Sequence, residues 1–323
     1  MSQLFKYISL FLTTLLLLFA CHSSAPIEVP PPPLKVACIT FVGYRPAIIA
    51  QEKNFFKAHG IEVDLSYVDF AQLQQGDFSA GKYDGIGLTL GDFMILSATN
   101  PDMQTVMVVD ETTGADVVVA QSNIQTLADL KGQKIGANLG GFSEVFVAEM
   151  LKQANLTTDD VTLVKFDALE IPQRLRNMAI QAGHTWEPYL SEAIELGAHI
   201  LFTSAQTPGL ILDLVAFRGE AIRNRAQDIQ AFVRGWSDAL NYWEDNLEEG
   251  NTIVSQALNI PIDTLSLEGV NLTDLKENKQ FFDLSNPNSI YDTAKIYMDF
   301  FIRTGNVTRI PEINTLFNPS FVQ

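Results

Sequence analysis

The chain has 323 residues, of which 47% are hydrophobic, and a formal net charge of −17. This length and apolar content are enough for two well-filled lobes, and the large acidic excess argues against a protein that binds nucleic acid or lies on anionic lipid. The charge does not identify a ligand, because a solvated acidic surface that keeps a protein soluble gives the same composition.

The N-terminal residues have the layout of a secretory signal. One positive charge, Lys6, precedes an apolar run over 8–19 that is too short for a comfortable membrane span. The run ends in Leu18-Phe19-Ala20-Cys21, which resembles a bacterial lipobox, although a small residue is usual where Phe19 stands. We therefore expect a signal peptide over 1–20 and a lipidated Cys21, with an uncleaved anchor helix as the alternative.

A spacer follows the predicted cleavage point. Residues 21–33 are polar and then proline-rich, and the run Pro30–Pro33 favours an extended polyproline II segment that would hold the body off the lipid. If Cys21 is lipidated, the remaining cysteine, Cys38, has no partner for an intrachain disulfide, and its apolar neighbours predict a buried, inert thiol. No histidine stands at metal-ligand spacing from a cysteine or a second histidine, so we expect no metal site.

Strands and helices alternate along the body in two series. In the first, the pattern predicts strands over 35–41, 61–67, 83–89 and 105–110 and helices over 46–59 and 90–98. In the second, it predicts strands over 116–120, 133–137, 161–166, 178–182, 198–203 and 210–217 and helices over 123–130, 142–154, 171–177 and 187–196, before a mostly helical remainder from residue 219. Two such series predict two α/β lobes whose mostly parallel sheets are flanked by helices.

Two strands mark the places where one series gives way to the other. These are 116–120 and 210–217, and we interpret them as a double crossover between the lobes. Lobe I is then 34–117 with 217–323, and lobe II is 118–216. Two segments that join two rigid lobes make a hinge, and the cleft between the lobes is where a ligand would be enclosed.

A glycine-rich segment is the first candidate for ligand contact. Asn138-Leu139-Gly140-Gly141-Phe142-Ser143-Glu144 follows a predicted strand and opens a predicted helix. Glycines let the backbone approach a ligand, and the free N–H groups of a helix start favour an anion. Gly140, Gly141, Phe142 and Ser143 are therefore predicted to cradle a sulfonate, carboxylate or nitrate. The alternative is a tight turn in which Ser143 only caps the helix.

Two further segments border the predicted cleft. In Gly87-Leu88-Thr89-Leu90-Gly91-Asp92, at the carboxyl end of a strand, Thr89, Leu90 and the adjacent amides can bind a polar head group. Asp92 either contacts the ligand or only caps the next helix. Asp116, at the first crossover, either pairs with a cationic group of a ligand or pins the hinge.

The fourth candidate segment is His184-Thr185-Trp186-Glu187-Pro188-Tyr189. Trp186 offers a flat face for stacking or for a cation. Pro188 suits an early helical position, which would place Trp186 and Glu187 at the helix start, beside the glycine-rich segment. His184 is interpreted as a structural histidine rather than a ligand contact. An aromatic stripe farther along, Phe232, Trp236 and Trp243, is interpreted as core packing, and the Asn-X-Thr triplets at Asn155, Asn271 and Asn306 as ordinary surface.

The ordered set of motifs resembles the solute-binding proteins of ABC importers, in the family that carries taurine, alkanesulfonates, nitrate and thiamine-precursor pyrimidines. The matching pieces, which span roughly 35–245, are Lys35–Gly43, Ile49–Phe56, Gly60–Val63, Asp84-Gly85, Gly114-Ala115-Asp116, Leu127–Gly132, Thr185–Tyr189 and Thr207–Leu210. The resemblance implies a two-lobed periplasmic-binding-protein-like fold (type II) that closes on a small molecule. It also implies a monomer without cofactor, metal or catalysis, held at the periplasmic or cell surface, whose partners are a permease and its ATPase.

The resemblance further implies that Phe41 and Tyr44 border the cleft. The ligand itself is a hypothesis: an anionic head at Gly140–Ser143 and an amine near Asp116 or Glu187, as in taurine or another zwitterion, because the four segments hold acids and no Lys or Arg. Two alternatives remain open. One is a lipoprotein that reports ligand occupancy to a membrane signalling protein. The other is an enzyme like the relative that makes the thiamine pyrimidine, although this chain lacks that relative's cysteine-rich iron motif.

Overall fold

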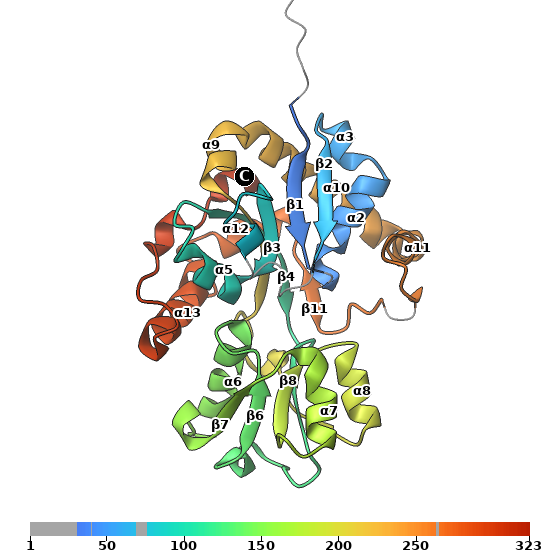
Figure 1. Ribbon diagram of the computed structural model, residues 1–323. Helices are drawn as coiled ribbons and strands as arrows, with labels where there is room; N and C mark the ends of the chain where they lie inside the picture. Colours follow the sequence, from blue (N-terminus) through green and yellow to red (C-terminus); the bar gives the residue numbers. More distant parts are fainter. Residues whose placement is uncertain (1–30, 40, 69–75, 263–264) are drawn as a thin grey trace, which may run out of the picture. The chain divides into compact units, whose positions relative to one another are not determined.

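The computed structural model describes residues 31–39, 41–68, 76–262 and 265–323. The chain divides into two units, 1–32 and 33–323, and the second contains all of the elements that follow (Figure 1). The predicted signal peptide, Cys21 and most of the proline spacer lie outside the described residues. Among the described helices, none combines the length and the apolar character needed to cross a bilayer.

The first lobe is built on a six-stranded sheet with the strand order β11-β4-β10-β3-β1-β2. Its strands are β1 (Leu34–Cys38), β2 (Val63–Tyr67), β3 (Gly85–Thr89), β4 (Gln104–Thr112), β10 (Leu212–Phe217) and β11 (Val270–Leu272). Its helices are α2 (Arg45–Glu52), α3 (Phe55–Ala58), α5 (Leu90–Ser97), α9 (Gly219–Asn224), α10 (Ala226–Asp245), α11 (Leu247–Leu258), α12 (Leu275–Phe281) and α13 (Ile290–Thr304).

The second lobe is built on a five-stranded sheet with the strand order β7-β6-β8-β5-β9 (Figure 1). Its strands are β5 (Val117–Ala120), β6 (Lys134–Ala137), β7 (Thr162–Lys165), β8 (Ala182–Thr185) and β9 (His199–Thr203). Its helices are α6 (Phe142–Gln153), α7 (Ile171–Arg176) and α8 (Tyr189–Glu195). The predicted fold class, two α/β lobes, is confirmed.

Both sheets are mixed rather than mostly parallel. The strands β10 and β5 run antiparallel to both of their neighbours, because each enters its sheet from the other lobe rather than through a helical crossover of its own lobe. The residues 212–216, assigned from the sequence to lobe II, pair with β3 and β4, so the return crossing ends before Leu212.

Hydrogen bonds from backbone N–H groups join the two segments that cross between the lobes. The Gly114 N–H donates to Ser204 Oγ (2.7 Å), and the Ser204 N–H donates to the Asp116 carbonyl (2.8 Å). Farther along, the Gly209 N–H donates to the Glu111 carboxylate (2.6 Å). The two segments that pass between the lobes are therefore hydrogen-bonded to each other rather than independent connections.

Three elements differ from the sequence prediction. The helix expected over 46–59 is broken at Asn54, whose left-handed φ of 61° ends one helix and starts another. The strand expected over 178–182 lies at 182–185 instead, because Met178 adopts a left-handed turn after α7. The three-residue strand β11 was not predicted. The stripe Phe232, Trp236 and Trp243 is buried in the core, as expected for packing.

Candidate functional site

The start of α5 brings Thr89 and Asp92 to the side of lobe I that faces lobe II. Thr89 is the last residue of β3 and the N-cap of α5, where its hydroxyl accepts the Asp92 N–H (3.2 Å) and donates to Asp92 Oδ2 (2.6 Å). Burial raises the pKa of Asp92 to about 7. The N-cap of α5 is therefore Thr89 rather than Asp92, the residue that the sequence offered for that role. The Thr89 hydroxyl binds Asp92 Oδ2 and leaves Oδ1 without a hydrogen-bond partner among the described residues.

The start of α6 forms the matching part of lobe II. The loop turns at Gly140, whose φ of 85° suits glycine, and its N–H groups are bound by the chain's own side chains. The Gly140 N–H donates to Glu144 Oε2 (2.8 Å), and the Asn138 N–H donates to Ser143 Oγ (3.2 Å). The predicted anion cradle is therefore a well-formed helix start, already partly supplied with oxygen acceptors.

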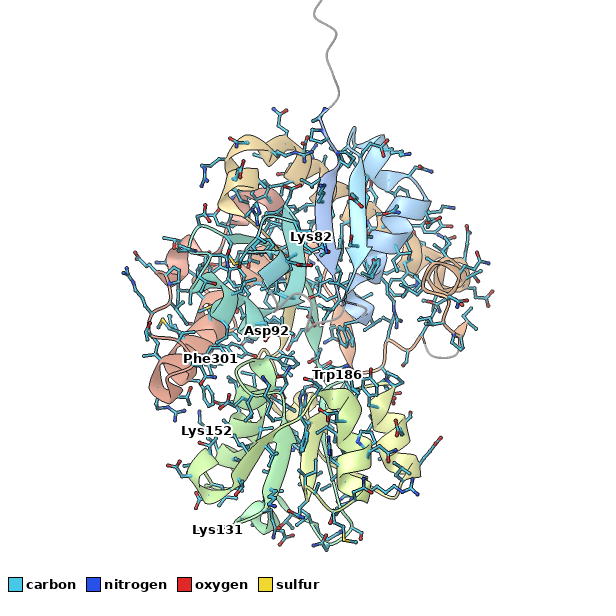
Figure 2. The ribbon with its side chains drawn as sticks, in the orientation of Figure 1. Lys82, Asp92, Lys131, Lys152, Trp186 and Phe301 are labelled. Atoms are coloured by element: carbon cyan, nitrogen blue, oxygen red, sulfur yellow. The ribbon has the colours of Figure 1, made fainter. Side chains whose placement is uncertain are left out.

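The two helix starts meet. A Cβ atom added to Gly141 would lie 2.5 Å from Asp92 Oδ1, and one added to Gly91 would lie 2.7 Å from Phe142 Cβ. The Phe142 N–H is close enough to Asp92 to lower the pKa of that carboxyl against the larger effect of burial. Figure 2 shows Asp92 and Trp186 where the lobes approach each other, with Lys131 and Lys152 farther down the second lobe. The position predicted for a ligand's anion is thus faced by the Asp92 carboxylate.

A second contact joins the lobes beside the first. Asn306, just after α13 of the first lobe, donates from Nδ2 to Glu144 Oε2 (3.2 Å) on α6. Glu144 thereby holds both the Gly140 turn of its own lobe and a side chain of the other lobe. The start of α6 is therefore a part of lobe II that contacts lobe I, both through Glu144 and through Gly141 and Phe142.

A pair of buried aspartates lies on the lobe I sheet. Asp110 on β4 and Asp213 on β10 are opposite each other in the strand register and are 0% and 2% exposed. Tyr44 donates its hydroxyl to Asp213 Oδ1 (2.7 Å). The Asp110 carboxyl lies close enough to Asp213 for the two groups to share a proton, and its oxygens have no other hydrogen-bond partner among the described residues. Burial raises the pKa of Asp213 to about 7, and burial together with the Asp213 charge raises that of Asp110 well above its usual range.

Arg45 is a buried base of lobe I. It begins α2 directly after Tyr44, is 7% exposed, and its Nε and Nη1 have no hydrogen-bond partner among the described residues. Burial lowers the pKa of Arg45 to about 10, so the guanidinium stays charged at neutral pH. A buried charge without a partner is costly, which makes Arg45 a candidate to bind an anion.

In lobe II a hydrogen-bonded chain connects the first crossing to the start of α6. His184 Nε2 is 3.0 Å from Asp116 Oδ1, and His184 Nδ1 is 2.7 Å from Ser143 Oγ. All three side chains are buried. The His184 ring also packs against Trp186 at 5.5 Å between ring centroids. This chain fixes the crossing, the helix start and the tryptophan relative to one another.

The structure thus brings most of the predicted residues together and leaves others apart. Trp186 lies 6.1 Å from Phe142 between ring centroids, so the first and fourth candidate segments, both in lobe II, meet as expected. Glu187 is exposed, and its carboxylate accepts hydrogen bonds from the N–H and the hydroxyl of Ser191 in the first turn of α8. The Glu187 carboxylate therefore caps α8. Leu90 is wholly buried and Phe41 packs half-buried against the core, where each serves packing.

Sequence reasoning missed three residues of this region and undervalued a fourth. Asp213 is a single acid inside an apolar strand, and Asp110 follows a run of buried apolar residues in β4. Both are readable signals, because a charged residue in a buried strand needs a reason. Arg45 was overlooked because it lies one residue beyond the Phe41–Tyr44 segment. His184, set aside as structural, is the centre of the chain that links Asp116 to Ser143.

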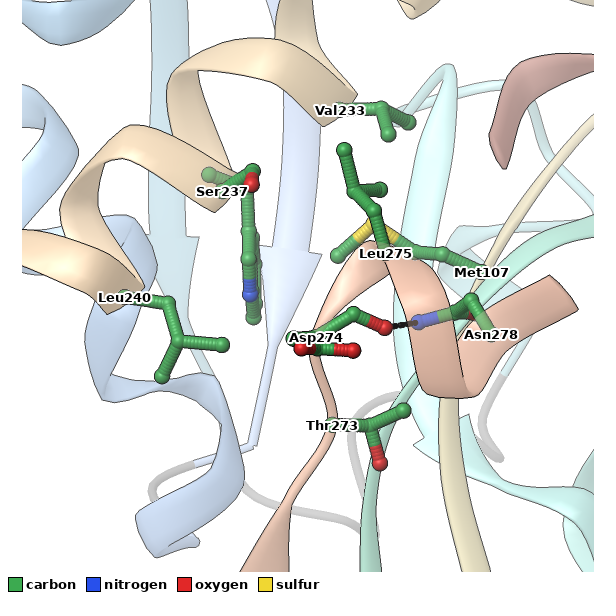
Figure 3. A pocket seen from close by; sticks show the side chains of 9 residues that line it. Met107, Val233, Ser237, Leu240, Thr273, Asp274, Leu275 and Asn278 are labelled. Atoms are coloured by element: carbon green, nitrogen blue, oxygen red, sulfur yellow. Dashed lines mark hydrogen bonds between the residues drawn. The ribbon is translucent and has the colours of Figure 1, made fainter. Parts of the chain in front are cut away.

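The two cavities described here lie elsewhere in the first lobe. Figure 3 shows a space of about 10 Å³ under α10 and α12, near Asn278, which is room for a single water molecule. A wider groove of about 430 Å³ follows β11 and is lined by Glu111, Glu244 and Glu277, but by none of the predicted residues. Among the described residues, no group of three or more His, Cys, Asp or Glu is arranged to hold a metal ion.

Known proteins of similar sequence include binding proteins. A Brucella abortus protein named as a binding protein is 22% identical over 284 residues, which is 85% of this chain and 86% of that protein. A Bacillus subtilis protein named as an aliphatic sulfonates-binding protein is 24% identical over 222 residues, 65% of each chain.

Solved structures share the fold over nearly the whole chain. The periplasmic aliphatic sulphonate binding protein SsuA of Escherichia coli superposes with a TM-score of 0.71 at 19% identity, covering 90% of this chain and 93% of that one. The desulfurization enzyme DSZB superposes less closely, with a TM-score of 0.63 at 13% identity, covering 90% and 98%. At these identities the likeness establishes the fold and leaves the chemistry to the residues. The family described as NMT1/THI5 like matches residues 43–249, and the chain therefore belongs to that family.

Proposed function

We propose that the protein is the extracytoplasmic solute-binding component of an ABC importer, lipidated at Cys21 and acting as a monomer that hands its solute to a permease. The two-lobed α/β fold, the family and the names of the relatives support this proposal. So does the paired crossing between lobes, which gives two rigid bodies one shared axis of movement. A ligand-sensing lipoprotein would need the same architecture and remains the alternative.

One observation carries the proposal. Asp92 of lobe I lies against Gly141 and Phe142 of lobe II, so polar groups from both lobes face one another in a buried interface. A purely structural interface would favour apolar side chains, because buried carboxylates without partners cost free energy. Buried polar groups at the junction of two lobes are the arrangement expected when the junction opens to admit a polar solute.

The proposed solute is small and carries a cationic nitrogen. Asp110 and Asp213 supply two buried acids on the sheet of lobe I, and a cation placed between them would relieve the cost of their burial. Arg45 would take an anionic group, so that a zwitterion such as taurine would use both ends, and Trp186 would cover an apolar part. The other predicted residues, Phe41, Tyr44, Thr89, Leu90, Asp116, Gly140, Phe142, Ser143 and Glu187, are proposed to shape or support the site.

Calorimetry of the purified mature protein against taurine, alkanesulfonates, nitrate and an aminopyrimidine tests the proposal. We expect heat from taurine or the aminopyrimidine, which carry a basic nitrogen. The variants Asp110→Asn and Arg45→Gln should weaken the same interaction at least tenfold. Heat from nitrate alone would reject a cationic nitrogen, and turnover of a solute without any partner protein would reject the binding function.

An enzyme finds less support among the described residues. The likeness to a desulfurization enzyme raises that question, and a thiol would be the natural nucleophile. Cys38, however, is fully buried, and burial raises its pKa to about 12, which keeps the thiol protonated at neutral pH. We therefore favour binding over catalysis.

A further inference from the structure

The start of α6 has the physical features of an anion site. The helix is 12 residues long, its first N–H groups point away from the helix, and the extended Gly141 before it carries no side chain. Two of the loop's N–H groups already donate to Glu144 and Ser143 of the same lobe. The Phe142 N–H faces Asp92 of lobe I, and a Cβ at Gly141 would point at the same carboxylate.

The group that faces them is a carboxylate of the chain itself. Asp92 is 6% exposed, and its Oδ2 accepts a hydrogen bond from the Thr89 hydroxyl. Its Oδ1 has no hydrogen-bond partner among the described residues. That free oxygen is the atom nearest to Gly141, where a Cβ would come within 2.5 Å. A buried, unpartnered oxygen is therefore directed at the helix start, in the place of an anionic ligand.

We propose that Asp92 is the resident anion of the α6 site and thereby sets the specificity of the protein, excluding sulfonate, nitrate and carboxylate groups from this helix start. This inference rests on the proposed solute-binding function and deepens it. A solute bound beside Asp92 must present a neutral or cationic group to α6, and an anionic group of the solute must be held elsewhere. The chain would then differ in this respect from any relative that leaves the corresponding helix start open.

The geometry also explains why the carboxylate is fixed in place. Thr89 holds Asp92 from its own helix start, and Gly91 packs on Phe142, so the side chain has no room to swing aside while the lobes are in contact. Burial raises the pKa of Asp92 to about 7, so the carboxylate is charged above that pH. A second anion at α6 would then lie within a few ångströms of it, and two like charges at that separation in a buried site repel strongly. Shape and charge therefore both exclude an anionic head group.

The test removes the carboxylate and offers a small anion in its place. At a pH well above 7, where Asp92 is ionised, methanesulfonate is titrated into the full mature protein, into Asp92→Ala and Asp92→Ser, and into Asp64→Ala, which removes an exposed acid on β2 as a matched control. We expect both Asp92 variants to bind methanesulfonate at least tenfold more tightly than the wild type, and the control to match the wild type. Amide NMR shifts should localise the new binding to Gly141 and Phe142. Asp92→Ser keeps a short capping hydroxyl in case Asp92→Ala does not fold.

Two results would overturn the inference. In one, the wild type binds methanesulfonate as tightly as the variants, with shifts at Gly141 and Phe142. In the other, folded Asp92 variants gain no affinity for it. Either result leaves the proposed function standing if the wild type still binds taurine or the aminopyrimidine. Conversely, a gain in the Asp92 variants with no solute bound by the wild type would retain the inference and reject the proposed ligand class.

Discussion

At the scale of single residues, burial governs the chemistry of the aspartates between the lobes. Asp92 and Asp213 each have a pKa raised to about 7, chiefly because burial disfavours the charged carboxylate. In the unfolded chain an aspartate titrates near 4, so between about pH 4 and pH 7 the unfolded state releases a proton that the folded state keeps. The contribution of each group to stability is therefore largest below pH 4 and falls as the pH rises to 7.

Asp213→Asn should remove part of this pH dependence. We expect the free energy of unfolding of the wild type to fall relative to that of the variant by up to about 1.4 kcal/mol per pH unit between pH 4 and 7. The charged and titratable neighbours Tyr44, Asp110 and Asp116 stay in place, and Asp110 loses one cause of its raised pKa. Urea unfolding at several pH values measures the difference. Parallel curves for the two proteins would contradict the shift.

Ser143→Ala tests the hydrogen-bonded chain of lobe II. The substitution leaves His184 Nδ1 and the Asn138 N–H without their partner in a buried place, so we expect a loss of about 1–3 kcal/mol of stability. Thermal or urea unfolding measures the loss, and Ser191→Ala on the exposed side of α8 serves as the control. A loss below about 0.5 kcal/mol would mean that water replaces the serine oxygen.

At the scale of elements, the sequence predicts what depends on local pattern and fails where distant strands decide. The alternation of apolar and polar residues located β2, β3, β6, β7 and α6 within a few residues. It misplaced β8, because the turn at Met178 gives no glycine or proline signal. It missed β11, because three residues form a strand here only by pairing with the far end of β4.

The candidate site was predictable to a similar extent. The helix starts at Thr89 and Gly140 follow from capping and glycine patterns, and both were identified. The sequence could not show that Asp92, at the start of α5, lies against the start of α6, because that contact depends on how the two lobes meet. The pairing of Asp110 with Asp213 likewise depends on a strand register between residues about a hundred positions apart.

Gly141→Ala probes the contact between the starts of α5 and α6. The backbone there is extended and accepts alanine, so the cost should come from the new Cβ pressing on Asp92 Oδ1. We expect a loss of about 1–3 kcal/mol in the wild type and a much smaller loss when Asp92 is already alanine. Unfolding of the two single variants and the double variant completes the cycle. Equal losses in both backgrounds would show that the helix starts do not touch in solution.

At the scale of the whole molecule, the two lobes are joined by two segments that are hydrogen-bonded to each other, and we expect the proposed closure to be a single hinge movement about them. Ser204 receives the Gly114 N–H and donates to Asp116, so both crossing segments turn together. A solute bound between the lobes then stabilises the folded protein by mass action, by about 2.7 kcal/mol at a hundredfold excess over its dissociation constant.

Trp186→Ala separates binding from folding at this scale. Trp186 is half-buried and packs on Phe142 and His184 at the face of lobe II. We expect the variant to keep a cooperative unfolding transition but to lose most of the rise in melting temperature that the solute with the largest calorimetric heat gives the wild type. An unchanged rise would exclude Trp186 from the site, and Trp236→Phe in the core provides a packing control.

The hydrogen bond between Asn306 and Glu144 has a consequence for how the protein is produced. Asn306 begins an Asn-Val-Thr triplet and is exposed, so secretion from yeast or insect cells would offer it to the glycosylation machinery. A sugar on Nδ2 would replace one of its two hydrogens and place a bulky polar group beside the start of α6, which contacts lobe I. In protein secreted from such a host, the glycan at Asn306 would hold lobe I away from the start of α6. Protein made in bacteria, or a Thr308→Ala variant, would carry no glycan there.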